Sequence, residues 1–201
     1  MKAAKRPAKK KAESAQSTQP LRIIGGQWRG RKLSFPAVEG LRPTGDRVRE
    51  TLFNWLGPLL PDAHCLDLYA GSGALGLEAL SRGARSATLV EKDPVAATQL
   101  RANLQQLGTD RGRALNEDSL KWLNGEPPAQ PFDVVFIDPP FDLDLWQESI
   151  ERLARPGWLA SDAAVYVESG PALEPELPAN WHLHRDKTTG QVRYRLYFLG
   201  S

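Results

Sequence analysis

The tetrapeptide Asp138-Pro139-Pro140-Phe141 contains residue types suited to chemistry on an amino group attached to an aromatic ring. Such an amino group is a poor nucleophile because its lone pair is delocalised into the ring. The two prolines stiffen the loop and lack N–H donors, so carbonyls and the Asp138 carboxylate remain as hydrogen-bond acceptors. Acceptors for both N–H groups, with the ring stacked on Phe141, would turn the lone pair towards an electrophile. We therefore predict that these four residues promote amino-group methylation by positioning and electrostatics, without a metal.

The segment Gly71-x-Gly73-x-x-Gly76 is a second pattern with chemical meaning, because glycines let a backbone approach a ligand closely. Alone it fits a nicotinamide dinucleotide site as well as an S-adenosylmethionine site. A nicotinamide enzyme has no use for the Asp138 loop, however, and this favours S-adenosylmethionine. The predicted cofactor-binding residues are Asp67, Ala70, Gly71, Ser72, Gly73, Glu91, Asp118 and Ser119.

Three of these residues are acidic and lie at predicted strand ends, the edge where ligands bind to parallel sheets. Asp67 belongs to the strand before the glycine loop. Glu91 ends the next strand, where a carboxylate can accept hydrogen bonds from ribose hydroxyls. Asp118 follows the third strand and either accepts the amino group of adenine or caps a helix beginning at Ser119; the two roles are compatible.

Strand-like and helical segments alternate from residue 64 onwards, which predicts a parallel sheet covered by helices on both faces. The predicted strands are Cys65–Tyr69, Ala87–Val90, Arg113–Leu115, Phe132–Ile137 and Ala163–Val167, and the predicted helices are Ala74–Ser81, Pro94–Leu107, Ser119–Leu123 and Leu143–Leu153. The last part differs, since Trp181–Lys187 and Val192–Phe198 flank Thr188-Thr189-Gly190, which indicates an antiparallel hairpin. The Asp138 loop then lies beside the strand of the glycine loop.

The N-terminal part of the chain is basic. Residues 1–20 contain six lysines and arginines and one acidic residue, and we expect them to be a disordered tail that either aids solubility or lies along phosphates. Residues 21–40 predict a β-hairpin around Gly25-Gly26, and a helix is expected over Arg47–Leu56, capped by Thr44 or Asp46. Basic residues cluster here at Arg22, Arg29, Arg31, Lys32, Arg42, Arg47 and Arg49. Trp28 among them either stacks on a base or packs in the core.

Length and composition set further bounds. A chain of 201 residues with a net charge of +2 suits one ordinary domain with a small extension. It contains no apolar run of about 20 residues and no secretory signal, so we expect no association with a membrane. Its single cysteine, Cys65, excludes an intrachain disulfide, and we expect the protein to be cytoplasmic. His182 and His184 lack nearby ligand partners, so no metal site is predicted.

Residues 21–199 resemble the RsmD family of bacterial 16S ribosomal RNA guanine-N2 methyltransferases. The glycine loop and the Asp138 loop are shared by many amino-methyltransferases. The segments that single out this family are Gly26-Gln27-Trp28-Arg29-Gly30-Arg31-Lys32-Leu33, Leu41-Arg42-Pro43-Thr44 and Asp46-Arg47-Val48-Arg49-Glu50-Thr51-Leu52-Phe53-Asn54-Trp55-Leu56. The sequence departs from the family at Gly45, where a threonine is expected.

The resemblance implies a Rossmann-like class I S-adenosylmethionine methyltransferase fold of the α/β class. Its mostly parallel seven-stranded sheet would end in an antiparallel hairpin and carry a small N-terminal β-hairpin extension. The implied parts are the disordered tail 1–20, an RNA-binding extension 21–57 and a methyltransferase domain 58–201. The implied RNA-binding residues are Trp28, Arg29, Arg31, Lys32, Arg42 and Arg47.

The implied substrate is the N2 amino group of one guanine of 16S ribosomal RNA, position 966 in conventional numbering, within the 30S subunit or an assembly intermediate. The chain is expected to act as a monomer. Two alternatives stay open. A DNA adenine-N6 methyltransferase could use the same loop, although residues 84–201 hold no insertion long enough for a target-recognition segment. A non-catalytic RNA-binding assembly factor would need neither the glycine loop nor Asp138.

Overall fold

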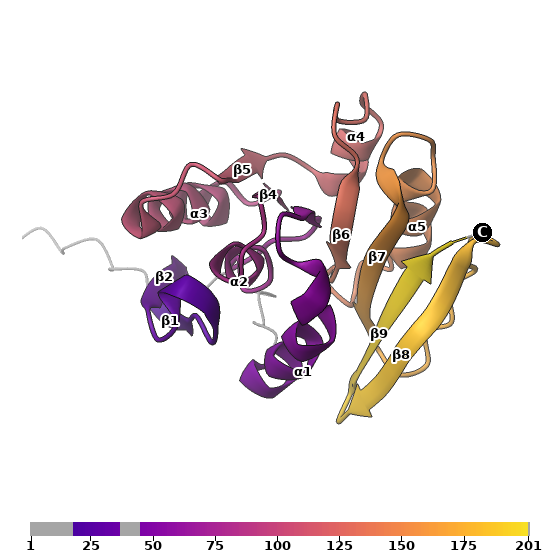
Figure 1. The fold of residues 1–201 in the computed structure, drawn as a ribbon, viewed down its shortest axis with the longest axis horizontal. Helices are drawn as coiled ribbons and strands as arrows, with labels where there is room; N and C mark the ends of the chain where they lie inside the picture. The colour runs from indigo at the N-terminus through magenta and orange to yellow at the C-terminus, as the bar shows by residue number, and fades with distance from the viewer. Residues whose placement is uncertain (1–17, 37–44, 201) are drawn as a thin grey trace, which may run out of the picture.

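The computed structural model describes residues 18–36 and 45–200, which form one seven-stranded sheet with helices on both faces and a separate small hairpin (Figure 1). The strand order is β5-β4-β3-β6-β7-β9-β8. The large sheet consists of β3 (His64–Asp67), β4 (Ser86–Glu91), β5 (Gly112–Asn116), β6 (Phe132–Ile137), β7 (Leu159–Ser169), β8 (Trp181–Thr189) and β9 (Val192–Leu199). Strands β3 to β7 are parallel, whereas β9 pairs antiparallel with both β7 and β8. The predicted fold class is confirmed.

Alternating side chains of the buried strands pack against two different helical layers. On one face lie α1 (Asp46–Leu56), α2 (Gly76–Ser81) and α3 (Pro94–Leu107), and on the other lie α4 (Ser119–Leu123) and α5 (Trp146–Leu153). Val134 and Phe136 of β6 belong to the first core, while Val135 and Ile137 belong to the second. The near-continuous apolar run that predicted a strand buried on both faces is confirmed.

Strand order reverses between β3 and β6, because the chain moves from β3 outwards to β4 and β5 and then returns to the other side of β3. The register pairs Asp67 with Phe136, so the loops after both strands leave the same edge of the sheet side by side. A crevice outside the carboxyl ends of strands at such a reversal is the usual ligand site of this architecture. The glycine loop and the Asp138 loop are therefore neighbours, as predicted.

Several element ends differ from the sequence predictions. Strand β1 (Thr18–Arg22) pairs with β2 (Lys32–Pro36), and its first three residues belong to the segment 1–20 that was expected to be disordered; residues 1–17 lie outside the described part. The N-cap of α1 is Gly45, without a side-chain hydrogen bond, so Asp46 is no cap and Thr44 lies outside the described residues. Helix α5 begins at Trp146 rather than Leu143, because the preceding residues extend the Asp138 loop.

The N-terminal hairpin is fastened to α2 through a buried carboxylate. Glu78 is fully buried and accepts hydrogen bonds from the N–H groups of Ile24 (2.8 Å) and Gly25 (2.7 Å). Gly26 has a positive φ of 72°, and a Cβ there would stand 1.9 Å from the carbonyl oxygen of Ser81, so only glycine allows this approach. Leu21 of the hairpin and Leu77 of α2 share one hydrophobic core. Because the extension and the rest of the fold share this core, the predicted boundary between the RNA-binding extension 21–57 and the methyltransferase domain 58–201 remains a proposal about function.

Candidate active site

A cavity of about 900 Å³ opens at the carboxyl edge of the sheet, where the sequence predicted a ligand site. Its floor is formed by the ends of β3, β4, β6 and β7 and by the loops that follow them. Phe35 and Val48 from the N-terminal part and Gln191 from the β8–β9 turn line it from other sides. Of the predicted cofactor and catalytic residues, those that line this one cavity are Asp67, Ala70, Gly71, Ser72, Glu91, Asp118, Ser119, Asp138, Pro139, Pro140 and Phe141.

The glycine loop owes its shape to two positive φ angles, 51° at Gly71 and 80° at Gly73. The N–H of Gly71 donates to Glu91 Oε2 (2.8 Å), and the N–H of Gly73 donates to the carbonyl of Ala70 (2.7 Å). A Cβ at Gly73 would stand 2.6 Å from a methyl of Leu100, so this glycine serves the packing of the loop on α3. The other side of the loop faces the cavity.

Two of the predicted acidic cofactor residues also support the loop. Asp67 is buried and accepts the N–H of Gly76 (2.8 Å); burial raises the pKa of Asp67 from 3.8 to about 7. Glu91 accepts the N–H groups of Asp93 (2.7 Å) and Gly71, which lower its pKa, but desolvation outweighs them and raises it. A carboxylate has about four acceptor positions, so Glu91 retains capacity for a ribose hydroxyl.

Asp118 caps α4, as one of the two predicted roles requires. Its side chain accepts the N–H of Lys121 (3.0 Å), and the ammonium of Lys92 lies 3.6 Å from the same carboxylate. The neighbouring Ser119 is buried and its hydroxyl donates to the carbonyl of Leu68. The Asp118 side chain is half-exposed and lines the cavity. Its cap of α4 is therefore compatible with a contact to the amino group of a ligand.

The Asp138 loop forms the wall of the cavity beside the glycine loop. The carbonyl of Pro140 accepts the N–H of Leu143 (3.1 Å) within a turn. The Phe141 ring is 45% exposed and meets Trp146 edge-on, with ring centroids 5.6 Å apart. One side of Phe141 is thereby held in place while the other remains available for stacking.

Sequence reasoning missed Glu168 and Tyr69, which also line the cavity. Glu168 is the last residue but one of β7, and it directly follows the predicted strand Ala163–Val167 just as Glu91 follows the predicted strand Ala87–Val90. The same rule about acidic residues at strand ends would therefore have found it. The hydroxyls of Tyr69 and Ser149 share a hydrogen bond of 2.6 Å, and burial raises the pKa of Tyr69 to about 12. The contribution of Gln191 had no signal in the sequence, because tertiary structure alone brings the β8–β9 turn to the cavity.

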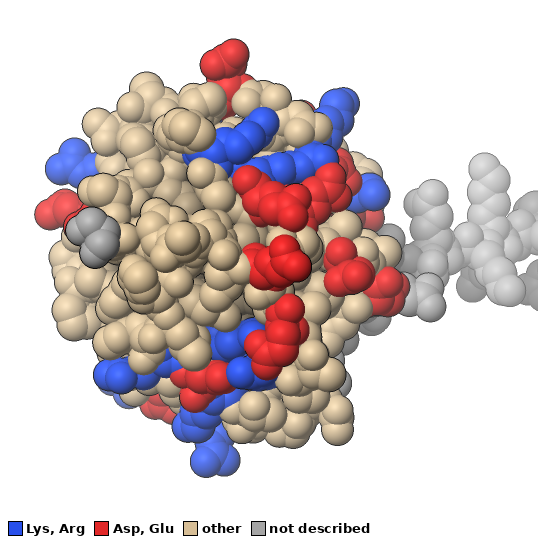
Figure 2. Space-filling model, turned by 90° about the vertical axis from the view of Figure 1, so that its right-hand side faces the viewer, with Lys and Arg blue, Asp and Glu red and all other residues tan. Residues whose placement is uncertain are grey.

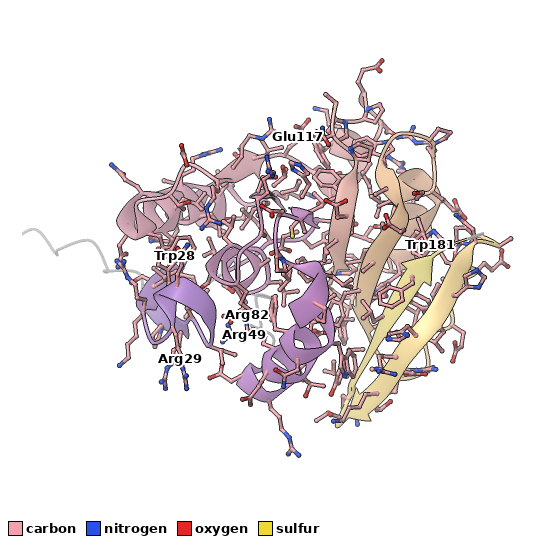
Figure 3. The ribbon with its side chains drawn as sticks, viewed as in Figure 1. Trp28, Arg29, Arg49, Arg82, Glu117 and Trp181 are labelled. Atoms are coloured by element: carbon pink, nitrogen blue, oxygen red, sulfur yellow. The ribbon has the colours of Figure 1, made fainter. Side chains whose placement is uncertain are left out.

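The predicted RNA-binding residues separate into exposed and buried ones. Trp28 is 9% exposed, and the guanidinium of Arg111 lies 5.6 Å from the centre of its ring, so the prediction of a stacking tip is wrong and the core alternative holds. Figure 3 shows Arg29 projecting away from the body, whereas Trp28 lies against it. Those that remain exposed are Arg29, Arg31, Lys32 and Arg47, and Arg42 lies outside the described residues.

Arg49 does not belong to that exposed surface, although the sequence placed it in the basic cluster. It is 1% exposed and lies near Arg82 between α1 and α2 (Figure 3). Its guanidinium donates to Asp46 (2.6 Å) and to the carbonyl of Arg22 (3.0 Å), and lies 3.8 Å from Glu78. Arg49 therefore joins α1 to the hairpin and to α2 instead of binding a phosphate.

The face opposite the hairpin, which carries β8 and the C-terminus, has mixed charge. Figure 2 shows acidic side chains in a band across this face, with basic side chains above and below it. Arg193 on this side pairs with Asp186 and Glu174. A surface of mixed sign gives a polyanion no net attraction, so the exposed basic hairpin is the better candidate for an RNA contact.

Comparisons with known proteins assign the chain to a family. A family model described as Conserved hypothetical protein 95 matches residues 21–198, and an Escherichia coli K12 protein named Ribosomal RNA small subunit methyltransferase D is 55% identical over 178 residues, which are 88% of this chain and 89% of that protein. The chain belongs to this family. The Haemophilus influenzae member is 49% identical over 191 residues, covering 94% and 98% of the two chains. The predicted family, RsmD, is confirmed.

Solved structures of methyltransferases have a similar fold. An Escherichia coli structure described as putative methyltransferase yhhF superposes with a TM-score of 0.83 and 51% identity, covering 91% of this chain and 99% of that one. A Thermus thermophilus 16S rRNA N2 G1207 methyltransferase, in complex with AdoMet and guanosine, gives a TM-score of 0.67 over 96% of this chain and 52% of that one. At 21% identity the second likeness shows the class I methyltransferase fold.

Two observations bear on the remaining predictions. No helix in the described ranges is both long and apolar enough to cross a membrane. Among the same residues, no group of three or more histidine, cysteine, aspartate or glutamate side chains is arranged to hold a metal ion. His182 and His184 lie exposed on β8, where His184 stacks on Phe198 with ring centroids 4.3 Å apart.

Proposed function

We propose that this chain transfers a methyl group from S-adenosylmethionine to the exocyclic N2 amino group of one guanine in 16S ribosomal RNA, position 966 as the RsmD resemblance implies. We expect it to act as a monomer on the 30S subunit or an assembly intermediate. The observation that carries the proposal is the single cavity lined by both the glycine loop and Asp138. Relatives named Ribosomal RNA small subunit methyltransferase D support the choice of ribosomal RNA.

The cavity has the features that a methionine-linked nucleoside requires. Its volume of about 900 Å³ and the backbone of the glycine loop leave room for a nucleoside, while Glu91 and Asp118 offer acceptors for ribose hydroxyls and an adenine amino group. A bound S-adenosylmethionine supplies an electrophilic methyl group on a cationic sulfur. Carboxylates around the cavity favour that positive charge. No metal is needed for this transfer, because the methyl donor is already activated.

Residues of the Asp138 loop would position the amino group. The Asp138 carboxylate and the Pro139 carbonyl accept its two N–H groups, and Phe141 stacks on the guanine ring. These contacts aim the nitrogen lone pair at the methyl group and hold the reacting atoms in a near-attack geometry. After transfer the nitrogen carries an extra proton, and Asp138 is placed to accept it. The Pro140 carbonyl would act through the turn that it closes with Leu143.

Transfer of isotope from methyl-labelled S-adenosylmethionine tests the proposal. The acceptors are 30S subunits from cells lacking the protein, naked 16S ribosomal RNA and duplex DNA, followed by mass analysis of the labelled nucleoside. We expect N2-methylguanosine from ribosomal RNA and no label in DNA. Label in N6-methyladenine of DNA would establish the adenine alternative instead. Tight binding to 30S subunits with no label in any acceptor would establish a non-catalytic assembly factor.

A further inference from the structure

Glu168 is a second carboxylate beside Asp138 in the cavity, and nothing in the proposed mechanism uses it. It is 6% exposed and lies at the end of β7. Ile137 of β6 pairs with Val167 of β7, so Asp138 and Glu168 follow side by side on neighbouring strands. Neighbouring strands are about 5 Å apart, which places the two residues within the width of one base edge.

The pleat of β7 directs Glu168 to the face of the sheet that carries Tyr166, and Asp138 lies at the end of the neighbouring strand. Phe136 pairs with Tyr166, and both side chains belong to the core beneath α1 and α2. Glu168 lies two residues beyond Tyr166 on β7 and therefore projects to that same face. Asp138 directly follows β6, and its charge acts on the Tyr166 hydroxyl, which lies on that face. Both residues line the cavity, so a base whose amino group reaches Asp138 also presents its adjacent ring atoms to Glu168.

Glu168 is held in place by groups that keep it an acceptor. The hydroxyl of Tyr166 donates to Glu168 Oε2 (2.8 Å), and the indole N–H of Trp146 donates to the Glu168 carbonyl (2.7 Å). Burial and the neighbouring carboxylates hold the pKa of Tyr166 well above its usual range, so this hydroxyl stays protonated and donates. A buried carboxylate oriented in this way can accept further N–H groups with its remaining lone pairs.

We propose that Glu168 determines the specificity for guanine by accepting the N1–H of the base, while Asp138 and Pro139 hold the reacting amino group. The inference rests on the proposed function. The Watson–Crick edge of guanine presents two neighbouring donors, N1–H and N2–H, which match the neighbouring carboxylates of Glu168 and Asp138. Adenine presents an acceptor at N1 beside its amino group, and this nitrogen would meet the Glu168 carboxylate lone pair to lone pair. Enzymes that act on an extruded base read this edge by hydrogen bonds.

A substrate analogue combined with an isosteric variant tests the role. Reconstituted 30S particles carry either guanine or 2-aminopurine at the target position; 2-aminopurine keeps the amino group but has an acceptor at N1. We expect the native enzyme to favour guanine in kcat/KM by about 10- to 100-fold, the usual value of one hydrogen bond to a charged group. Glu168→Gln should reduce this preference at least about tenfold, because its amide N–H can donate to N1 of 2-aminopurine.

Further variants separate specificity from folding. Tyr166→Phe keeps the carboxylate but removes the group that orients it, so the guanine preference should fall less than in Glu168→Gln. Glu176→Gln, an exposed carboxyl outside the cavity, should leave the preference unchanged. Equal losses of kcat/KM on both substrates in Glu168→Gln would overturn the inference. If the native enzyme does not methylate the particle that carries guanine at the target position, the proposed function itself fails.

Discussion

The cavity and the N-terminal extension differ in charge and in how their side chains are held. Carboxylates such as Asp67 and Glu91 line the cavity, are largely buried and accept backbone N–H groups. Arg29, Lys32 and Arg47 of the extension are exposed and project into solvent. Acidic walls disfavour phosphates and favour N–H donors and a cationic sulfur, whereas basic side chains attract the RNA backbone. Under the proposed function, this contrast would let one base enter the cavity while the RNA backbone stays outside it.

Removing the carboxylate beside the reacting nitrogen should have the largest effect. We expect Asp138→Ala to lower kcat by about 100- to 1,000-fold, the usual cost of losing one preorganised group at a transition state. Affinity for S-adenosylmethionine, measured by calorimetry, should stay the same, because the glycine loop is intact. Asp110→Ala alters an exposed carboxylate before β5 and serves as the control. A normal kcat in Asp138→Ala would show that the loop has no catalytic role.

The buried carboxylate between the two regions should affect stability next most strongly. Glu78→Ala removes the partner of Arg82 (2.7 Å) and of two backbone N–H groups, and leaves the Arg49 cation beside an uncharged site. We expect the free energy of unfolding to fall by about 3 kcal/mol. Thermal unfolding should then occur about 6–12 °C lower. Glu50→Ala, at an exposed residue of α1, should change the free energy of unfolding little. An equal decrease in both variants would mean that Glu78 does not fasten the extension.

The raised pKa of Asp67 predicts a pH-dependent contribution to stability. Between its ordinary value of 3.8 and about 7, the folded protein keeps a proton on Asp67 that the unfolded chain releases. Stability from this group is therefore lost as the pH rises through that window. Asp67→Asn removes the loss, so the variant should gain on the order of 1–3 kcal/mol relative to the native protein between pH 4 and 7. Urea titrations without cofactor measure the free energy of unfolding of both proteins at each pH. A difference between them that does not vary with pH would contradict the prediction, and Asp62→Asn is the exposed control.

The exposed basic residues should have the smallest effect, and one confined to RNA. Arg29→Ala with Lys32→Ala removes two possible phosphate contacts, which should weaken binding about tenfold at physiological salt and reduce the salt slope by about one per contact. Affinity for S-adenosylmethionine should not change. Arg155→Ala, which removes an exposed arginine just after α5, is the matched control. Equal losses of cofactor and RNA affinity would show that the hairpin supports the fold rather than RNA binding.

Local patterns were sufficient to predict the elements and the two loops of the site. The apolar strand Phe132–Ile137 and the helix Pro94–Leu107 have the predicted bounds. The signals for both are local in sequence: a continuous apolar run for the strand, and Asp93 as the N-cap of the helix. The acidic ends of β3 and β4 were found in the same way. The family resemblance, confirmed by the comparisons, led from there to a methyltransferase of the RsmD family.

Only tertiary structure decided which polar residues are buried. Trp28 and Arg29 are neighbours in sequence, yet one packs beneath Arg111 and the other projects into solvent. Arg49 resembles a phosphate-binding arginine until α2 brings Glu78 to it across 29 residues of chain. Glu168 and Gln191 line the same cavity as Asp138 because β7 pairs with β6 and β9 turns back against β7. Residue type and spacing determine which chemistry a side chain can perform. Long-range packing decides which surface the side chain faces, and therefore whether it can perform that chemistry in the folded protein.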